Sequence, residues 1–221
     1  MLKKFYRLIQ IIRQDHKKKG ALVGTGHDFA HALMVAQYAK LISKKSYADL
    51  AWVAGLYHNT DRIFNDYTKS FIIGKLNFYL KNTDFNDGDK KVIIEAVLNH
   101  SRKPNVNDNQ ITIALMDADK LANLGYLATI RAAQFRYSDP PIDLRYINTA
   151  PPKANYKNPG SVFWDIKNRQ DWKKKGWFRL PKARHLAKKY FREDQQVING
   201  LVKKFKEAGL MPYPFPKDFK K

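Results

Sequence analysis

Apolar residues recur at helical spacing along most of the chain. In residues 2–18 they form one stripe, with lysine and arginine on the other face, which predicts an amphipathic helix. No segment alternates apolar and polar residues as a half-buried strand does, so the predicted fold class is all-α. The same helical spacing predicts further helices at residues 27–42, 46–58, 66–81, 91–100, 111–125, 126–135 and 181–208, and a partly helical stretch at 163–177.

Proline marks a change of composition after the seventh of these helices. Residues 1–137 are expected to form a helical core that includes the N-terminal helix. Residues 138–160 contain five prolines and few periodic apolar residues, which predicts a long surface loop. Residues 161–221 are expected to form a basic helical cap and an extended tail in the same domain, because prolines at 212, 214 and 216 end any helix.

The chain is strongly basic, with 41 Lys and Arg against 20 Asp and Glu and a net charge of +21. This balance favours anionic partners such as nucleotides, nucleic acid or anionic lipid. A lysine-coated surface without a specific partner is an equal alternative, because the lysines are scattered along the whole chain. The first helix is expected to dock on the core, although a membrane-surface helix has the same pattern.

Cysteine is absent, which excludes disulfides and thiolate metal ligands. No apolar run approaches the roughly 20 residues that a transmembrane helix needs. The basic N-terminus lacks the apolar region and cleavage site of a signal peptide. These features predict a cytoplasmic protein.

Three short segments place histidine or aspartate at the polar edge of predicted helices. They read HDFAH at 27–31, LYHN at 56–59 and DADKL at 117–121. His27 and His31 are four residues apart and therefore share one helix face. Imidazole and carboxylate groups gathered from several rigid helices can hold a metal that activates water.

The order of these segments resembles the HD-domain superfamily of metal-dependent phosphohydrolases, over roughly residues 20–208. The resemblance implies an HD-domain-like helical bundle with a C-terminal helical cap. It also implies that His31, His58 and Asp119 are ligands of a divalent metal ion, Mn, Mg, Fe or Co.

The sequence departs from the family pattern at one position. Asn59 stands where the His-Asp pair of the family has its aspartate. Asparagine offers one neutral oxygen and an NH₂ that must point away from a cation, so Asn59 is expected to be a weak fourth ligand. Asp117 remains an alternative to Asp119, because the two point about 200° apart around a helix and cannot both face the metal equally.

Other polar residues near these segments are candidates for catalysis and substrate binding. Asp61 is equally explained as a capping or surface carboxylate, and His100 as a cap at a helix C-terminus. The expected catalytic residues are His100, Asp61 and Lys120, and the expected substrate-binding residues are His27, Asp28, Arg62 and Arg102.

The leading hypothesis is a metal-dependent phosphohydrolase that acts on a nucleotide or a related phosphorylated small molecule. Activity would be weakened by Asn59, which removes one negative charge beside the metal. The alternative is a non-catalytic HD-like domain that binds a nucleotide or nucleic acid through its basic surface.

Overall fold

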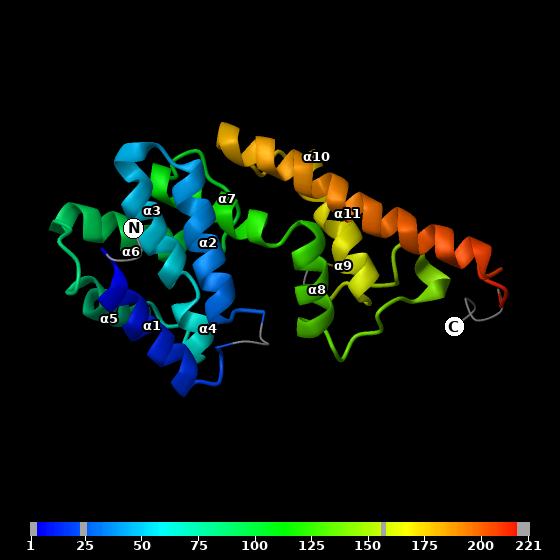
Figure 1. Cartoon of the computed structure of the whole chain (residues 1–221), viewed down its shortest axis with the longest axis horizontal. Helices are drawn as coiled ribbons and strands as arrows, with labels where there is room; N and C mark the ends of the chain where they lie inside the picture. Colours follow the sequence, from blue (N-terminus) through cyan, green and yellow to red (C-terminus); the bar gives the residue numbers. More distant parts are fainter. Residues whose placement is uncertain (1–3, 23–25, 156–157, 216–221) are drawn as a thin grey trace. The chain divides into compact units, whose positions relative to one another are not determined.

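The computed structural model describes residues 4–22, 26–155 and 158–215. All regular secondary structure in these ranges is helical (Figure 1), which confirms the all-α prediction. Within them, no helix is long and apolar enough to cross a membrane. The start of the first predicted helix, residues 156–157 of the predicted surface loop and the proline at 216 lie outside the described residues.

The chain divides into two compact units. The first comprises Met1–Ala122 and Phe178–His185, and the second Asn123–Trp177 and Leu186–Lys221. The domain boundaries expected after residues 137 and 160 stay a prediction. The helices that belong wholly to the first unit are α1 (Tyr6–Lys18), α2 (Phe29–Ile42), the 3₁₀ helix η1 (Lys45–Tyr47), α3 (Ala48–Tyr57), α4 (Thr60–Phe64), α5 (Lys69–Leu80), α6 (Asp87–Asn99) and α7 (Gln110–Ala122).

Two details of the first unit differ from the sequence prediction. The helix α6 begins at Asp87, ahead of the start predicted at residue 91, because the side chain of Asn86 accepts a hydrogen bond of 2.8 Å from the backbone of Asp89 and caps the helix. The short helix α4 was not predicted, since five residues are too few for a periodic pattern.

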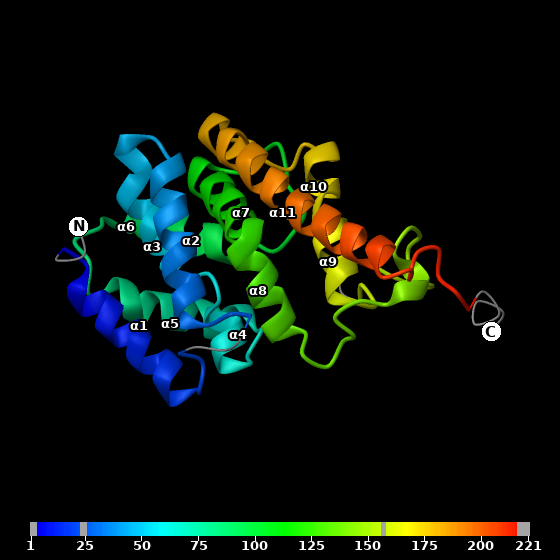
Figure 2. The ribbon, with the colours of Figure 1, turned by 45° about the vertical axis from the view of Figure 1, so that its right-hand side comes forward.

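The core of the first unit is built around α2 and α3. The α2 helix packs against both α3 and α7, and α6 packs against α3 and α7 (Figures 1 and 2). Every residue of α3 from Leu50 to Tyr57 is buried. A Cβ atom on Gly55 would lie 2.6 Å from the Cα of Ala36, so α2 and α3 approach each other too closely for any side chain there.

The α1 helix docks on this core. Leu8 and Ile12 are buried, and the ring of Phe5 stacks on that of the buried Trp52, with 5.0 Å between the centroids. The apolar stripe of the first predicted helix is therefore used for packing, as expected. His16 is buried on the same helix.

The second unit contains α8 (Gly125–Phe135), the 3₁₀ helix η2 (Leu144–Tyr146), α9 (Val162–Arg169), α10 (Asp171–Lys174) and the part of α11 (Pro181–Glu207) that follows His185. Its core gathers apolar residues from these elements: Ala132, Ile147, Val162, Phe163, Ile166 and Ile198.

A buried carboxyl group stabilises the start of α8. Oδ1 of Asp194 accepts a hydrogen bond of 2.9 Å from the backbone of Gly125, which has a φ of 81°. Burial raises the pKa of Asp194 to about 6, against the opposing effect of Arg169. The fully buried side chain of Asp194 is therefore more easily protonated in the folded protein than in the unfolded chain.

The close approach at Gly55 predicts that Gly55→Ala lowers the free energy of unfolding by at least about 2 kcal/mol, because the new methyl group meets backbone atoms that cannot turn away. The matched control is Gly74→Ala in the middle of α5, where nothing lies within 4 Å of the new atom. That change should raise stability by about 0.5–1 kcal/mol. Urea unfolding of both variants measures the difference, and equal effects would contradict the close packing.

The pKa of Asp194 predicts a pH dependence of stability. Because the folded-state pKa is raised, the group favours folding at pH values below about 4, and this contribution is lost as the pH rises to about 6. Asp194→Asn keeps an acceptor for Gly125 and removes the titration. Relative to the unsubstituted protein, the variant should gain on the order of 1–3 kcal/mol between pH 4.5 and 7.5. Urea unfolding of both proteins at the two pH values measures this gain. A stability difference between the proteins that is the same at both pH values would refute the raised pKa of Asp194.

Candidate metal centre

His58 follows α3 directly and is 1% exposed. Its Nδ1 lies 2.7 Å from the carbonyl oxygen of Gly55, which can only accept, so Nδ1 carries the proton and donates it. Burial lowers the pKa of His58 well below its ordinary value, and the nearby Asp119 offsets this only in part. The imidazole is therefore neutral, and Nε2 keeps a lone pair that makes no hydrogen bond within the described residues.

His31 and Asp119 lie close to Nε2 of His58. Nε2 of His31 lies 3.3 Å from Oδ1 of Asp119, and Nε2 of His58 lies 3.8 Å from the same oxygen. The ligand atoms of these three residues all lie within 4.8 Å of one another. They come from α2, the end of α3 and α7, which pack together in the core.

The charge of Asp119 suits a cation. Burial raises its pKa, but contacts with His31 and His58 outweigh burial and hold it well below the ordinary value. One carboxylate and two imidazoles form a ligand set that proteins use for divalent transition metals. The three residues therefore fit a metal by the chemistry of their donor atoms and by the lone pair of His58.

Asp117 lies elsewhere. It is fully buried, and its Oδ2 accepts hydrogen bonds from the backbone of Arg179 at 2.9 Å and of Leu180 at 2.8 Å. Burial raises its pKa to about 6. The structure thus brings Asp119 to the two histidines, whereas Asp117 binds the segment that leads into α11.

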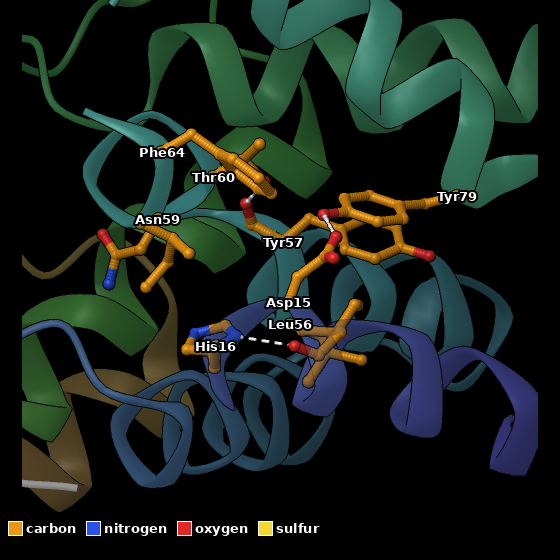
Figure 3. Close-up of a pocket in the computed structure, with 10 residues that line it drawn as sticks. Asp15, His16, Leu56, Tyr57, Asn59, Thr60, Phe64 and Tyr79 are labelled. Atoms are coloured by element: carbon orange, nitrogen blue, oxygen red, sulfur yellow. Dashed lines mark hydrogen bonds between the residues drawn. The ribbon is translucent and has the colours of Figure 1, made fainter. Parts of the chain in front are cut away.

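Asn59 occupies the position between His58 and α4. It is 4% exposed, and its amide nitrogen makes no hydrogen bond within the described residues. It lines a small cavity together with His16 of α1 (Figure 3). Its assignment as a fourth ligand stays a prediction.

The other two histidines of the predicted site lie on either side of the three candidate ligands. The ring of His100 is 5.4 Å from that of His58, while its Nδ1 donates to the carbonyl oxygen of Val97 at 2.6 Å. His100 therefore caps α6 and also borders the candidate metal centre. The ring of His27 is 6.2 Å from that of His31, and burial lowers the pKa of His27 to about 4.

Asp28 and Lys120 both bond to the backbone. Oδ1 of Asp28 caps α2 by accepting from the backbone of His31 at 2.8 Å, so it fixes the turn that carries a candidate ligand. Nζ of Lys120 donates to the carbonyl oxygen of Met116 at 3.1 Å, and burial lowers its pKa.

Asp61 and Arg62 form an ion pair near His27. Nε of Arg62 lies 3.4 Å from Oδ2 of Asp61, and both residues act electrostatically on the imidazole of His27. Oδ1 of Asp61 is enclosed and accepts no hydrogen bond from the described part of the chain. A carboxylate oxygen and a half-exposed guanidinium therefore lie on this side of the candidate metal centre.

Arg102 is bound away from the three candidate ligands. Its guanidinium pairs with the fully buried carboxylate of Asp108, which also binds Nη1 of Arg179 at 2.7 Å. Sequence reasoning missed this cluster, because Arg179 is 71 residues from Asp108 along the chain. It also missed Gly55, for which one signal existed: a lone glycine inside an apolar helical run.

Comparisons with known proteins concern the family and the fold. Residues 28–124 match the family model of the HD domain. The fold resembles a crystal structure from Lactobacillus plantarum, at 14% identity and a TM-score of 0.68 over 94% of this chain and 99% of that chain. An HD-superfamily hydrolase from Bacillus thuringiensis has 17% identity and a TM-score of 0.66, over 92% and 97% of the two chains.

A third solved structure is YpgQ from Bacillus subtilis in complex with ADP. It has 20% identity and a TM-score of 0.59, over 87% of this chain and 97% of that chain. No curated protein sequence matches this chain. At these identities, the structural likeness concerns the fold.

The different positions of the two aspartates predict opposite effects of their removal. Asp117→Ala breaks two hydrogen bonds to a buried carboxylate and should lower the free energy of unfolding by about 2–4 kcal/mol. Asp119→Ala should change stability much less and should abolish binding of Mn²⁺. Urea unfolding and calorimetric titration of both variants measure this, and loss of Mn²⁺ binding in a folded Asp117→Ala protein would reverse the assignment.

Proposed function

With residues 28–124 forming an HD domain, we propose that this protein is a metal-dependent phosphohydrolase acting on a nucleotide or a related phosphorylated small molecule. One observation carries the proposal: the ligand atoms of His31, His58 and Asp119 converge within 4.8 Å, with the two histidines buried and Asp119 partly exposed. The fold likeness to HD-superfamily hydrolases supports it.

His31, His58 and Asp119 would hold the metal, and Asn59 would add a neutral oxygen. When bound, a divalent metal supplies a Lewis acid that lowers the pKa of water and polarises a phosphoryl oxygen. The protein prepares the ligands. The carbonyl oxygen of Gly55 accepts the Nδ1 proton of His58 and so leaves Nε2 unprotonated. Asp28 caps α2 and so fixes the helical turn that carries His31.

Asp61 would accept the proton of the attacking water through its enclosed Oδ1. His100, whose Nδ1 proton is held by Val97, can exchange a proton with substrate only at Nε2. The cations Arg62 and Lys120 would offset phosphate charge. His27 and Asp28 would contact polar groups of the substrate, and Arg102, which pairs with Asp108, stays a predicted substrate-binding residue.

Two observations favour a nucleotide as the substrate class. The net charge of +21 attracts polyanions. YpgQ, which has a similar fold, was crystallised in complex with ADP. The metal is a divalent ion of the Mn, Mg, Fe or Co type, because imidazole suits transition metals and carboxylate suits harder ions.

Metal binding tests the first half of the proposal. Calorimetric titration should give one Mn²⁺ per chain, lost in His58→Ala because the buried ligand nitrogen is removed. His185→Ala is the matched control, since His185 is an exposed histidine of α11 outside the three-residue group. Equal Mn²⁺ binding by both variants would eliminate this metal centre.

Turnover tests the second half. Phosphate or pyrophosphate release from a panel of nucleoside di- and triphosphates should require Mn²⁺ and fall at least about 100-fold in His58→Ala, with the fold retained by circular dichroism. Release that is unaffected by His58→Ala would mean that the chemistry lies elsewhere.

A non-catalytic binding domain is the second candidate, and Asn59 and the basic charge favour it. In that case nucleic-acid affinity should fall steeply with salt, as phosphate contacts displace counterions. Salt-dependent binding by a protein that releases no phosphate from any nucleotide would support this alternative, while absence of binding at low salt would remove it.

A further inference from the structure

A small cavity lies between α1 and the α3–α4 junction (Figure 3). Its volume is ≈ 10 Å³, and its lining includes His16 and Asn59. A single water molecule needs roughly 10–15 Å³ and two to four polar partners. The cavity is therefore the right size for one water molecule and too small for a larger ligand.

Three residues that line this cavity have a buried side-chain polar atom without a hydrogen-bond partner within the described residues: Nε2 of His16, Nδ2 of Asn59 and the hydroxyl of Tyr57. His16 and Asn59 are both 4% exposed. An enclosed polar atom without a partner costs about 1–3 kcal/mol, so native proteins normally satisfy it with protein atoms or ordered water.

The unpartnered atoms of His16 and Asn59 are chemically complementary. Nδ1 of His16 lies 2.9 Å from the carbonyl oxygen of Ile12 and must donate its proton there. Burial lowers the pKa of His16, so the ring is neutral and Nε2 is an acceptor. Nδ2 of Asn59 is a donor. A water molecule can donate to the first and accept from the second.

We propose that His16 is a positioning residue that orients the amide of Asn59 through one ordered water molecule in this cavity. In the view of Figure 3, the amide nitrogen of Asn59 lies on the His16 side of the amide and the oxygen on the opposite side. With the nitrogen held by the water, Oδ1 is left for the metal. The inference rests on the proposed function, since it concerns a ligand of the proposed metal centre.

The proposal links the buried His16 to the unusual Asn59. The two oxygens of an aspartate are alike, so either can face a metal. An asparagine turned the wrong way presents N–H groups to a cation, so a metal centre with asparagine needs a device that fixes the amide. An acceptor on the other side of the residue is such a device, and α1 supplies it.

Mn²⁺ affinity in a double-mutant cycle tests the role of His16. His16→Leu should weaken Mn²⁺ binding about tenfold, the size typical of residues that orient a metal ligand. In an Asn59→Asp background the same change should have almost no effect, because no amide needs orienting. A purely structural His16 would weaken binding equally in both backgrounds, and that result would overturn the proposal.

His16→Gln is the conservative variant. Its Oε1 can accept from the same water, so it should restore most of the lost Mn²⁺ affinity and also serve if His16→Leu does not fold. Weakening by His16→Gln as large as that by His16→Leu, with unchanged melting temperature, would contradict the acceptor role.

A high-resolution crystal structure of the metal-free protein tests the water itself. It should show one ordered water within hydrogen-bonding distance of Nε2 of His16 and Nδ2 of Asn59. A cavity filled by a side chain, or an amide with its oxygen towards His16, would overturn the inference. This readout needs no metal, so it separates the inference from the proposed function, which fails if the unsubstituted protein binds no Mn²⁺.

Discussion

The close approach of α2 and α3 at Gly55 is the constraint on which the candidate metal centre depends. The absence of a side chain at Gly55 lets α3 lie against Ala36 of α2, and the carbonyl of the same glycine receives the Nδ1 proton of His58. Gly55 thus sets both the close packing of α2 on α3 and the tautomer of His58. Because His31 lies in the first turn of α2 and His58 directly follows α3, bringing the helices together also brings the two imidazoles together.

Burial and charge divide the polar residues of the core into two groups. Asp119 is held ionised by the histidines, whereas Asp117 has a raised pKa and binds backbone N–H groups. Without a cation, the lone pair on Nε2 of the buried His58 has no hydrogen-bond partner among the described residues, although His31 and Asp119 lie beside it. A divalent cation would satisfy all three, and this is why they are best explained as ligands.

Local patterns predicted the helices and the grouping of His31, His58 and Asp119, because both depend on spacing along a helix and on a motif order that the resemblance supplied. They could not predict the partner of Asp117 or the cap at Asn86. The first depends on Arg179, 62 residues away, and the second on a side-chain bond within a stretch rich in turn residues. The cavity beside His16 could not be predicted from local patterns either, since its lining combines residues of α1 with residues of the core on which α1 packs.

Anomalous diffraction at the manganese edge, from a crystal soaked in Mn²⁺, is the most direct measurement of the central claim. The account predicts one peak within roughly 2.0–2.3 Å of a nitrogen of His31, Nε2 of His58 and a carboxylate oxygen of Asp119. A peak at Asp117, or no peak at these three residues under conditions that saturate the protein with metal, would contradict it.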